Sequence, residues 1–139
     1  MVDFSRLLRL GKEQFDQGNR FRVLIVDDNV PLAQLLVLLL YQSGFEVRTV
    51  DSGHLALDAA LAFRPHFILL DIGLPGLDGY QVAEQIRNDP ILKSVVIIAI
   101  SAYGPDYRAE RRCRADFNHY LTKPVLIDDL LPLLYLNEC

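Results

Sequence analysis

The sequence predicts an α/β fold in which a five-stranded parallel sheet carries helices on both faces. From Phe21 onward, apolar runs alternate with helical patterns at regular intervals, which is typical of successive βα units. Three of these runs, VLIV, FILL and VVIIAI, are continuous rather than alternating. Central parallel strands have this character because helices cover both of their sides. The expected strands are residues 22–26, 46–50, 66–70, 95–100 and 118–121.

Five helices are expected, one after each strand, and residues that favour helix ends mark most of them. Asn29 can cap the first helix, with Pro31 in its first turn and Gly44 after its end. Ser52 can cap the second, which stops near Pro65. The other three are expected over residues 79–88 with Asp78 as the cap, over about 105–114, and from just after Pro124 to about Asn137.

The composition indicates one folded domain. The chain has 139 residues, of which 51% are hydrophobic and 23% charged, and its net charge is −4. A chain of this size buries roughly two-thirds of its unfolded surface, so it needs no metal or disulfide to build a core. The mild acidity argues against direct binding to nucleic acid or to anionic membranes.

Cysteine usage and hydropathy indicate a cytoplasmic protein. Cys113 and Cys139 form neither a disulfide framework nor a metal-ligand spacing. We also find no signal peptide and no apolar run of membrane-spanning length.

Residues 1–20 stand outside the repeating pattern and form an N-terminal extension to the domain over residues 21–139. Apolar side chains recur in the extension at helical spacing, which predicts a short helix. The alternative is a solvated or disordered start, because chain termini are often loose. The apolar side chains at this spacing are Phe4, Leu7, Leu8 and Phe15.

Polar side chains follow four of the predicted strands where each apolar run ends. Asp27 and Asp28 follow the first strand, Asp71 the third, Ser101 the fourth and Lys123 the fifth. In an open parallel sheet, ligands bind beyond these carboxyl ends. Like unit charges about 4 Å apart repel by roughly 4 kcal/mol at an effective dielectric near 20. We therefore expect a bound cation to offset the repulsion among three neighbouring carboxylates. All-oxygen ligation suits Mg²⁺ or a similar hard ion such as Mn²⁺.

These five residues also predict phosphoryl transfer. The metal and Lys123 would neutralise the phosphoryl oxygens, Ser101 would donate a hydrogen bond, and a free carboxylate would act as nucleophile. Asp71 is the best candidate because it stands alone, whereas Asp27 and Asp28 form a pair suited to the metal. Each residue taken singly could be only a turn former or helix cap. Their shared position at one sheet edge favours the functional interpretation.

The sequence resembles the receiver domain of bacterial two-component response regulators, over residues 21–138. The motifs that carry the resemblance are VLIVDDN at 23–29, LLDIGLPGLDGYQVAEQIR at 69–87, IIAISAYG at 97–104 and HYLTKPV at 119–125. The resemblance implies a doubly wound, flavodoxin-like (CheY-like) fold with strand order 2-1-3-4-5.

The resemblance also implies roles for individual residues. Asp71 would accept a phosphoryl group from a phosphohistidine of a histidine kinase or a phosphotransfer domain. Asp28 would bind Mg²⁺ directly and Asp27 mainly through water, while Asp71 would share the metal. The backbone carbonyl of Gly73 would complete the protein ligands, and Lys123 would pair with the phosphoryl group.

A conformational switch is implied as well. Ser101 would donate a hydrogen bond to the phosphoryl group, and Tyr120 would swing into the space that Ser101 leaves. Ala102 has a small side chain that leaves an open path to Asp71.

Other residues near the site are expected to be structural. Pro75 would stiffen the loop after Asp71, Gly79 would let the next helix start close to that loop, and the resemblance implies a cis peptide bond before Pro124. The three histidines show no catalytic grouping and are also expected to be structural; they are His54, His66 and His119.

The function predicted on these grounds is that of a receiver which is phosphorylated and then changes its affinity for a downstream protein. It would not be an enzyme beyond its own phosphotransfer and autodephosphorylation, and would bind neither nucleic acid nor membrane directly. Two alternatives remain: a receiver-like scaffold that is not phosphorylated, and a phosphatase with an aspartate nucleophile. Such phosphatases generally carry the nucleophile on the first strand.

The first expected helix has an unusual composition, because residues 32–41 read LAQLLVLLLY and are apolar all round. A surface helix is normally apolar on one face only. In the 2-1-3-4-5 arrangement the first and last helices lie on the same side of the sheet. We therefore hypothesise that the N-terminal extension covers that side, within one chain or across a homodimer.

Overall fold

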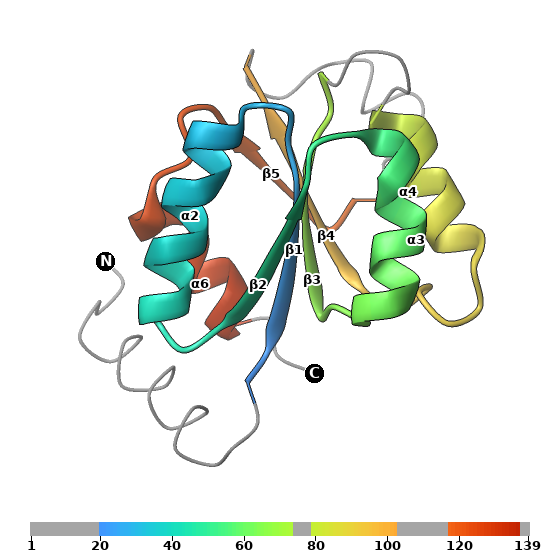
Figure 1. Ribbon diagram of the computed structural model, residues 1–139, viewed down its shortest axis with the longest axis horizontal. Helices are drawn as coiled ribbons and strands as arrows, with labels where there is room; N and C mark the ends of the chain where they lie inside the picture. Colours follow the sequence, from blue (N-terminus) through green and yellow to red (C-terminus); the bar gives the residue numbers. More distant parts are fainter. Residues whose placement is uncertain (1–19, 74–78, 103–116, 137–139) are drawn as a thin grey trace.

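The structure is a computed structural model that describes residues 20–73, 79–102 and 117–136. Its elements alternate between strands and helices along most of the chain (Figure 1). They are β1 (Arg22–Val26), α2 (Val30–Gln42), β2 (Glu46–Val50), α3 (Gly53–Phe63), β3 (Phe67–Asp71), α4 (Gly79–Asn88), β4 (Val96–Ser101), β5 (His119–Thr122) and α6 (Ile127–Leu136).

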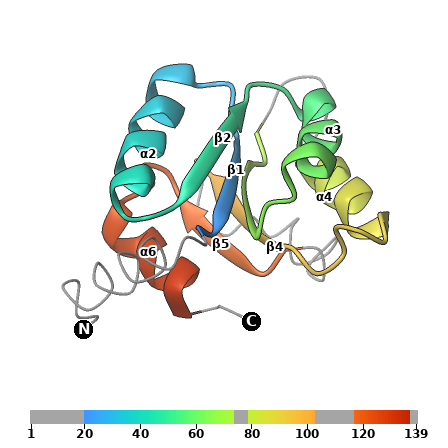
Figure 2. The same ribbon diagram turned by 60° about the horizontal axis from the view of Figure 1, so that its bottom comes forward.

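The five strands form one parallel sheet in the order β2-β1-β3-β4-β5. Helices α2 and α6 cover one face, while α3 and α4 cover the other, as Figures 1 and 2 show from two directions. The predicted fold class and strand order are therefore confirmed. Because all strands are parallel, their carboxyl ends lie at one edge of the sheet.

Strand β1 shows why the central apolar runs are continuous. Val23 and Ile25 belong to the core under α2 and α6, whereas Leu24 and Val26 belong to the core under α3 and α4. All four side chains are fully buried. Successive side chains of a strand point to opposite faces, so a strand with a core on each side has no position for a polar residue.

Three strands lie one residue later than predicted. The structure has β3, β4 and β5 at 67–71, 96–101 and 119–122, against expectations of 66–70, 95–100 and 118–121. Asp71 pairs with Ile100, and Ser101 pairs with Thr122. Hydrogen-bonded pairing thus continues through the first polar residue after each apolar run. Asp71 and Ser101 are the last residues of their strands, and the sheet itself fixes their backbones.

The helix caps agree with the sequence. The Asn29 side chain accepts from the Leu32 N–H at the start of α2, and the Ser52 hydroxyl accepts from the His54 N–H at the start of α3. Gly44 after α2 has a positive φ of 99°, a conformation that glycine adopts without strain. The last helix begins at Ile127, later than expected.

Some predictions fall on residues outside the described part of the chain. They are the expected helices within residues 1–19 and 105–114, and the positions of Pro75 and Asp78. Within the described ranges, no helix combines the length and apolar character needed to cross a bilayer.

Candidate functional site

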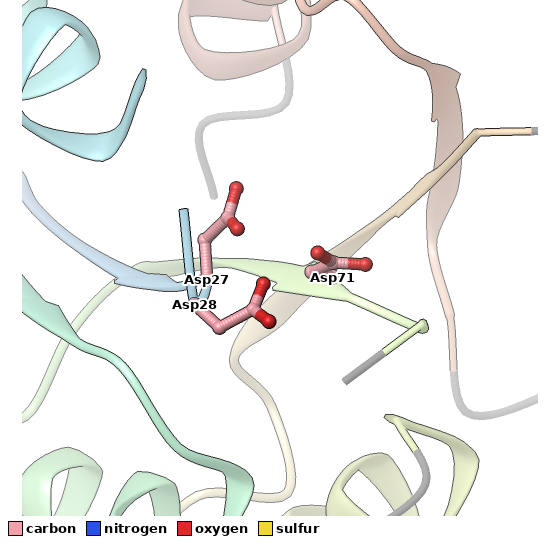
Figure 3. A group of neighbouring side chains, drawn as sticks. All are labelled: Asp27, Asp28 and Asp71. Atoms are coloured by element: carbon pink, nitrogen blue, oxygen red, sulfur yellow. The ribbon is translucent and has the colours of Figure 1, made fainter. Parts of the chain in front are cut away.

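Three aspartates lie together at the carboxyl edge of the sheet. Asp27 and Asp28 follow β1, and Asp71 ends the neighbouring strand β3. One carboxylate oxygen from each lies within 4.8 Å of the others, and Figure 3 shows the three side chains gathered beyond the strand ends. The sequence placed these residues at one edge; the structure brings them into a single cluster.

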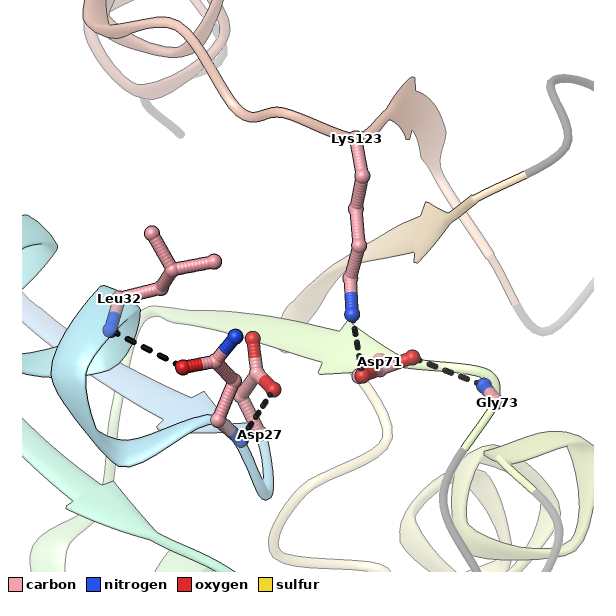
Figure 4. A network of polar contacts seen from close by, with 6 residues as sticks. Asp27, Leu32, Asp71, Gly73 and Lys123 are labelled. Atoms are coloured by element: carbon pink, nitrogen blue, oxygen red, sulfur yellow. Dashed lines mark hydrogen bonds and ion pairs between the residues drawn. The ribbon is translucent and has the colours of Figure 1, made fainter.

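Both oxygens of the Asp71 carboxylate have a protein partner. The Lys123 ammonium lies 2.7 Å from Oδ2, and the Gly73 backbone N–H donates to Oδ1 at 2.8 Å (Figure 4). The Asp71 side chain is only 6% exposed, whereas that of Lys123 is 28% exposed. The Lys123 backbone is fixed in turn, because its N–H donates to the Ser101 carbonyl at 2.8 Å. Asp71 is therefore held in a defined orientation from two sides.

Asp27 shapes the turn that leads into α2. Its Oδ1 accepts a hydrogen bond from the Asn29 backbone N–H at 2.9 Å, while the Asn29 side chain caps the helix (Figure 4). Asp27 is buried and Asp28 is exposed. The cluster thus has a closed side, formed by Asp27 and Asp71, and a side open to solvent at Asp28.

The charges at the site perturb one another. Burial raises the pKa of Asp27 above its ordinary value; the Asn29 N–H and Lys123 oppose this effect, and the Asp71 carboxylate adds to it. Burial alone would lower the pKa of Lys123. Its hydrogen bond and charge interaction with Asp71, aided by Asp27 and Asp28, outweigh burial and raise that pKa. Lys123 is therefore charged over the physiological pH range.

The carboxylate cluster fits a divalent cation such as Mg²⁺. Its limit of 4.8 Å between oxygens is close to the roughly 4 Å that separates opposite ligands of one Mg²⁺ ion. Carboxylate oxygens are the ligands that hard ions prefer. Gly73, whose carbonyl is a predicted ligand, is exposed on the loop that follows Asp71. The open side at Asp28 lets an ion enter and keep some of its water.

The predicted switch residues lie on the two strands beyond β3. Ser101 is buried at the end of β4, and Tyr120 on β5 is paired with Ala99. Tyr120 is partly buried in the core under α3 and α4, where its ring lies 5.4 Å from that of Phe117. Side chains at positions 99 and 101 of one strand share a face. Ser101 and Tyr120 therefore belong to the same side of the sheet.

Gly79 and Pro124, two of the residues predicted to be structural, lie in the described part of the chain, whereas Pro75 lies outside it. A Cβ atom at Gly79 would lie 2.5 Å from the Ile72 Cα, so only glycine lets α4 start this close to the loop after β3. The peptide bond between Lys123 and Pro124 is cis, as predicted. Ala102 is exposed directly after β4.

Sequence reasoning missed two backbone donors at the site. Gly73 was assigned only a carbonyl ligand, yet its N–H binds Asp71. Asn29 was assigned only a helix cap, yet its N–H binds Asp27. In both cases an aspartate accepts from the N–H two residues later, a local turn that the aspartates following β1 and ending β3 could have indicated.

Comparison with known proteins agrees with this geometry. The family model described as the response regulator receiver domain matches residues 23–135. The polar-differentiation response regulator DivK of Brucella anthropi is 33% identical over 105 residues, which are 76% of this chain and 85% of DivK. The response regulator PleD of Caulobacter vibrioides is 35% identical over 112 residues, 79% of this chain but only 24% of PleD.

Solved structures show the same fold. The chemotaxis response regulator CheY4 of Vibrio cholerae superposes with a TM-score of 0.77 at 25% identity, covering 84% of this chain and 97% of CheY4. The CheY-like response regulator receiver domain of Methylobacillus flagellatus gives 0.75 at 28% identity, covering 86% and 100%. With the matched family model and the aspartate cluster at the sheet edge, these likenesses show that the chain belongs to the response regulator receiver domain family.

Proposed function

We infer that Asp71 accepts a phosphoryl group from a phosphohistidine of a histidine kinase or phosphotransfer domain, and that this changes the affinity of the chain for a downstream protein. The observation that carries the proposal is the environment of Asp71. Its buried carboxylate is paired with Lys123 and lies within 4.8 Å of two further carboxylates. An isolated structural ion pair does not need this excess of negative charge around it.

The transfer step balances as a simple displacement. A carboxylate oxygen of Asp71 attacks phosphorus, the P–N bond of the phosphohistidine breaks, and the departing imidazole nitrogen takes up a proton. Lys123 already contacts Oδ2, so its ammonium is positioned to neutralise charge on the incoming phosphoryl oxygens. The Gly73 N–H holds the other oxygen and keeps the carboxylate from rotating.

A bound Mg²⁺ would add positive charge on the phosphoryl oxygens, held by Asp27, Asp28, Asp71 and the Gly73 carbonyl. Receiver domains bind this ion at an acidic pocket. The aspartate cluster supports the assignment because its charge is only partly balanced by Lys123.

The response to phosphorylation is assigned to Ser101 and Tyr120. A phosphoryl group adds about −1.5 to −2 charge and strong acceptor oxygens, which attract a nearby hydroxyl. Ser101 ends the strand beside Asp71 and carries such a hydroxyl, while exposed Ala102 next to it offers little steric hindrance. Tyr120 lies on the same face and is partly buried, so its ring position can respond to movement of Ser101.

The test is incubation with a small phosphodonor such as phosphoramidate in the presence of Mg²⁺, followed by intact-mass measurement. The wild type should gain one phosphoryl group and Asp71→Asn should gain none. Asp51→Asn is the matched control, because Asp51 follows β2 at the same sheet edge but is exposed and outside the cluster. It should be phosphorylated like the wild type.

Two results would contradict the proposal. A wild type that gains no phosphoryl group while folded and supplied with Mg²⁺ would support the scaffold alternative. Sustained release of phosphate from simple phosphoesters, abolished by Asp71→Asn, would support a phosphatase.

A further inference from the structure

The outward face of α2 is largely apolar, unlike that of a usual surface helix, although Gln34 and Gln42 are also exposed. Leu35, Leu38 and Tyr41 are 52%, 55% and 55% exposed, and Val30 and Leu32 extend the apolar surface at the start of the helix. The segment Val30–Gln42 contains no charged residue. We call this surface the α2 outer face.

Helix α4 shows the contrast. Its exposed positions are all polar: Gln81, Glu84, Gln85 and Asn88. A helix that is apolar all round is normally buried, and a contiguous exposed apolar surface marks a place where something binds. The inner face of α2 already packs on the sheet through Ala33, Leu36 and Leu40, so the outer face needs a different occupant.

The chain before the described domain enters beside this surface. The guanidinium of Arg20 lies 4.8 Å from the centre of the Tyr41 ring, in a cation–π contact at the last turn of α2. Figure 1 shows the start of β1 and the end of α2 at the same end of the molecule. Arg20, the first described residue, therefore lies at one end of the α2 outer face.

The sequence of the segment before Arg20 suits this surface. Phe4, Leu7, Leu8 and Phe15 fall on one side of a helix, while basic and acidic residues occupy the other side. As a helix, residues 4–15 would be about 18 Å long, against about 20 Å for the 13 residues of α2. Residues 4–15 would therefore form an amphipathic helix about as long as α2, joined by residues 16–19 to Arg20 at one end of the α2 outer face.

We propose that residues 4–15 pack as an amphipathic helix on the α2 outer face of the same chain. This goes beyond the proposed receiver activity, because the family match covers residues 23–135 and so excludes the segment. Running back from Arg20, the segment would approach Val30, two residues after Asp28.

Limited trypsin digestion of the full chain tests the proposal, because the segment contains basic residues at which trypsin cuts. Cleavage follows the population of the released segment. The double variant Leu35→Gln/Leu38→Gln should speed cleavage within residues 1–19 by roughly tenfold, because polar side chains weaken the contact. Leu55→Gln is the matched control, since Leu55 is 51% exposed on α3, across the sheet. It should leave the rate unchanged.

Three outcomes would overturn the proposal. The wild-type segment could be cut as fast as an isolated peptide of the same sequence, or the α2 double variant could leave its rate unchanged. Protection could also rise with protein concentration together with dimer formation in sedimentation, which would make a second copy the occupant.

A variant within residues 4–15 tests the same contact without changing α2, and so controls for misfolding of the α2 double variant. Phe4→Ser/Leu8→Ser leaves every residue of the described domain unchanged, so the domain should still unfold cooperatively in urea while the α2 outer face becomes uncovered. Fluorescence of the apolar dye ANS should then rise several-fold over wild type. Equal dye binding by both proteins would contradict a covering segment.

Discussion

Replacement of Asp28 by asparagine should stabilise the metal-free chain. Asp28 lies within 4.8 Å of two other carboxylates, and Lys123 supplies one compensating charge. Burial, with the Asp71 carboxylate adding to it, raises the pKa of Asp27, so the folded chain disfavours the charged form of Asp27. Removing the most exposed of the three charges relieves repulsion without uncovering any buried group.

The size of the effect follows from Coulomb's law. At 4.8 Å, two unit charges repel by about 1 kcal/mol in bulk water and by about 3.5 kcal/mol at an effective dielectric of 20. Asp28 is exposed, which places it nearer the first value, and its attraction to Lys123 cancels about one of its two repulsions. We therefore expect Asp28→Asn to raise the free energy of unfolding by about 1 to 2 kcal/mol.

The assay is urea unfolding followed by circular dichroism in low-salt buffer at pH 7 with EDTA, for wild type, Asp28→Asn and the control Asp51→Asn. The control should stay within about 0.5 kcal/mol of wild type, as surface substitutions usually do. Salt near 1 M should shrink the gain of Asp28→Asn, because it reduces the Debye length to about 3 Å. Added Mg²⁺ should stabilise wild type more than Asp28→Asn.

The reasoning would be refuted if Asp28→Asn unfolded at the same or a lower urea concentration than wild type under these conditions. A gain that high salt left unchanged would also contradict it, because the origin would then not be charge repulsion.

Two further predictions concern the support of the site. Gly79→Ala should lower the free energy of unfolding by about 1 to 3 kcal/mol in a urea titration, because its Cβ would lie 2.5 Å from a backbone Cα. Gly73→Ala is the control and should lower it less, because the nearest atom to its Cβ would be 3.4 Å away. Burial, with the charge of Arg22, lowers the pKa of His66 below its ordinary 6.5, so the folded chain binds fewer protons there than the unfolded chain. This contribution to stability is full above pH 6.5 and is lost as pH falls through the lowered value. Between pH 7 and 5, the melting temperature of His66→Asn should therefore fall less than that of wild type. Asparagine is chosen because its side-chain oxygen can still accept from the Arg22 N–H. The control His54→Asn, at an exposed position, should behave like wild type.

Much of the fold was predictable because burial leaves a direct mark on composition. Strand β1 has a core on each side, so its four buried residues had to be apolar, and its position could be read exactly as the structure has it. The caps at Asn29 and Ser52 are local in sequence and were equally readable. Strand order could not be predicted in this way, because an apolar run indicates burial but not which strand lies beside it. The predicted order came only from the family resemblance.

The strand ends and the finer contacts of the site were less predictable for a physical reason. Asp71 and Ser101 are polar, yet backbone pairing includes them in their strands, because ladder hydrogen bonds do not depend on side-chain polarity. The sequence indicated that Lys123 and Asp71 share an edge. It could not give their 2.7 Å contact, which depends on how a 52-residue stretch of chain folds back.

The separation of the site residues along the chain has a consequence for biosynthesis. Asp27 comes from the first strand and Lys123 follows the last, with Asp71 between them. These contacts are non-local, and such contacts form late because long stretches of chain must close first. A ribosome-bound chain that ends before Lys123 has the aspartates but lacks their counter-charge. The Asp71–Lys123 pair therefore forms only after the last strand has been made, and a shorter chain would hold the acidic cluster without the lysine that balances it.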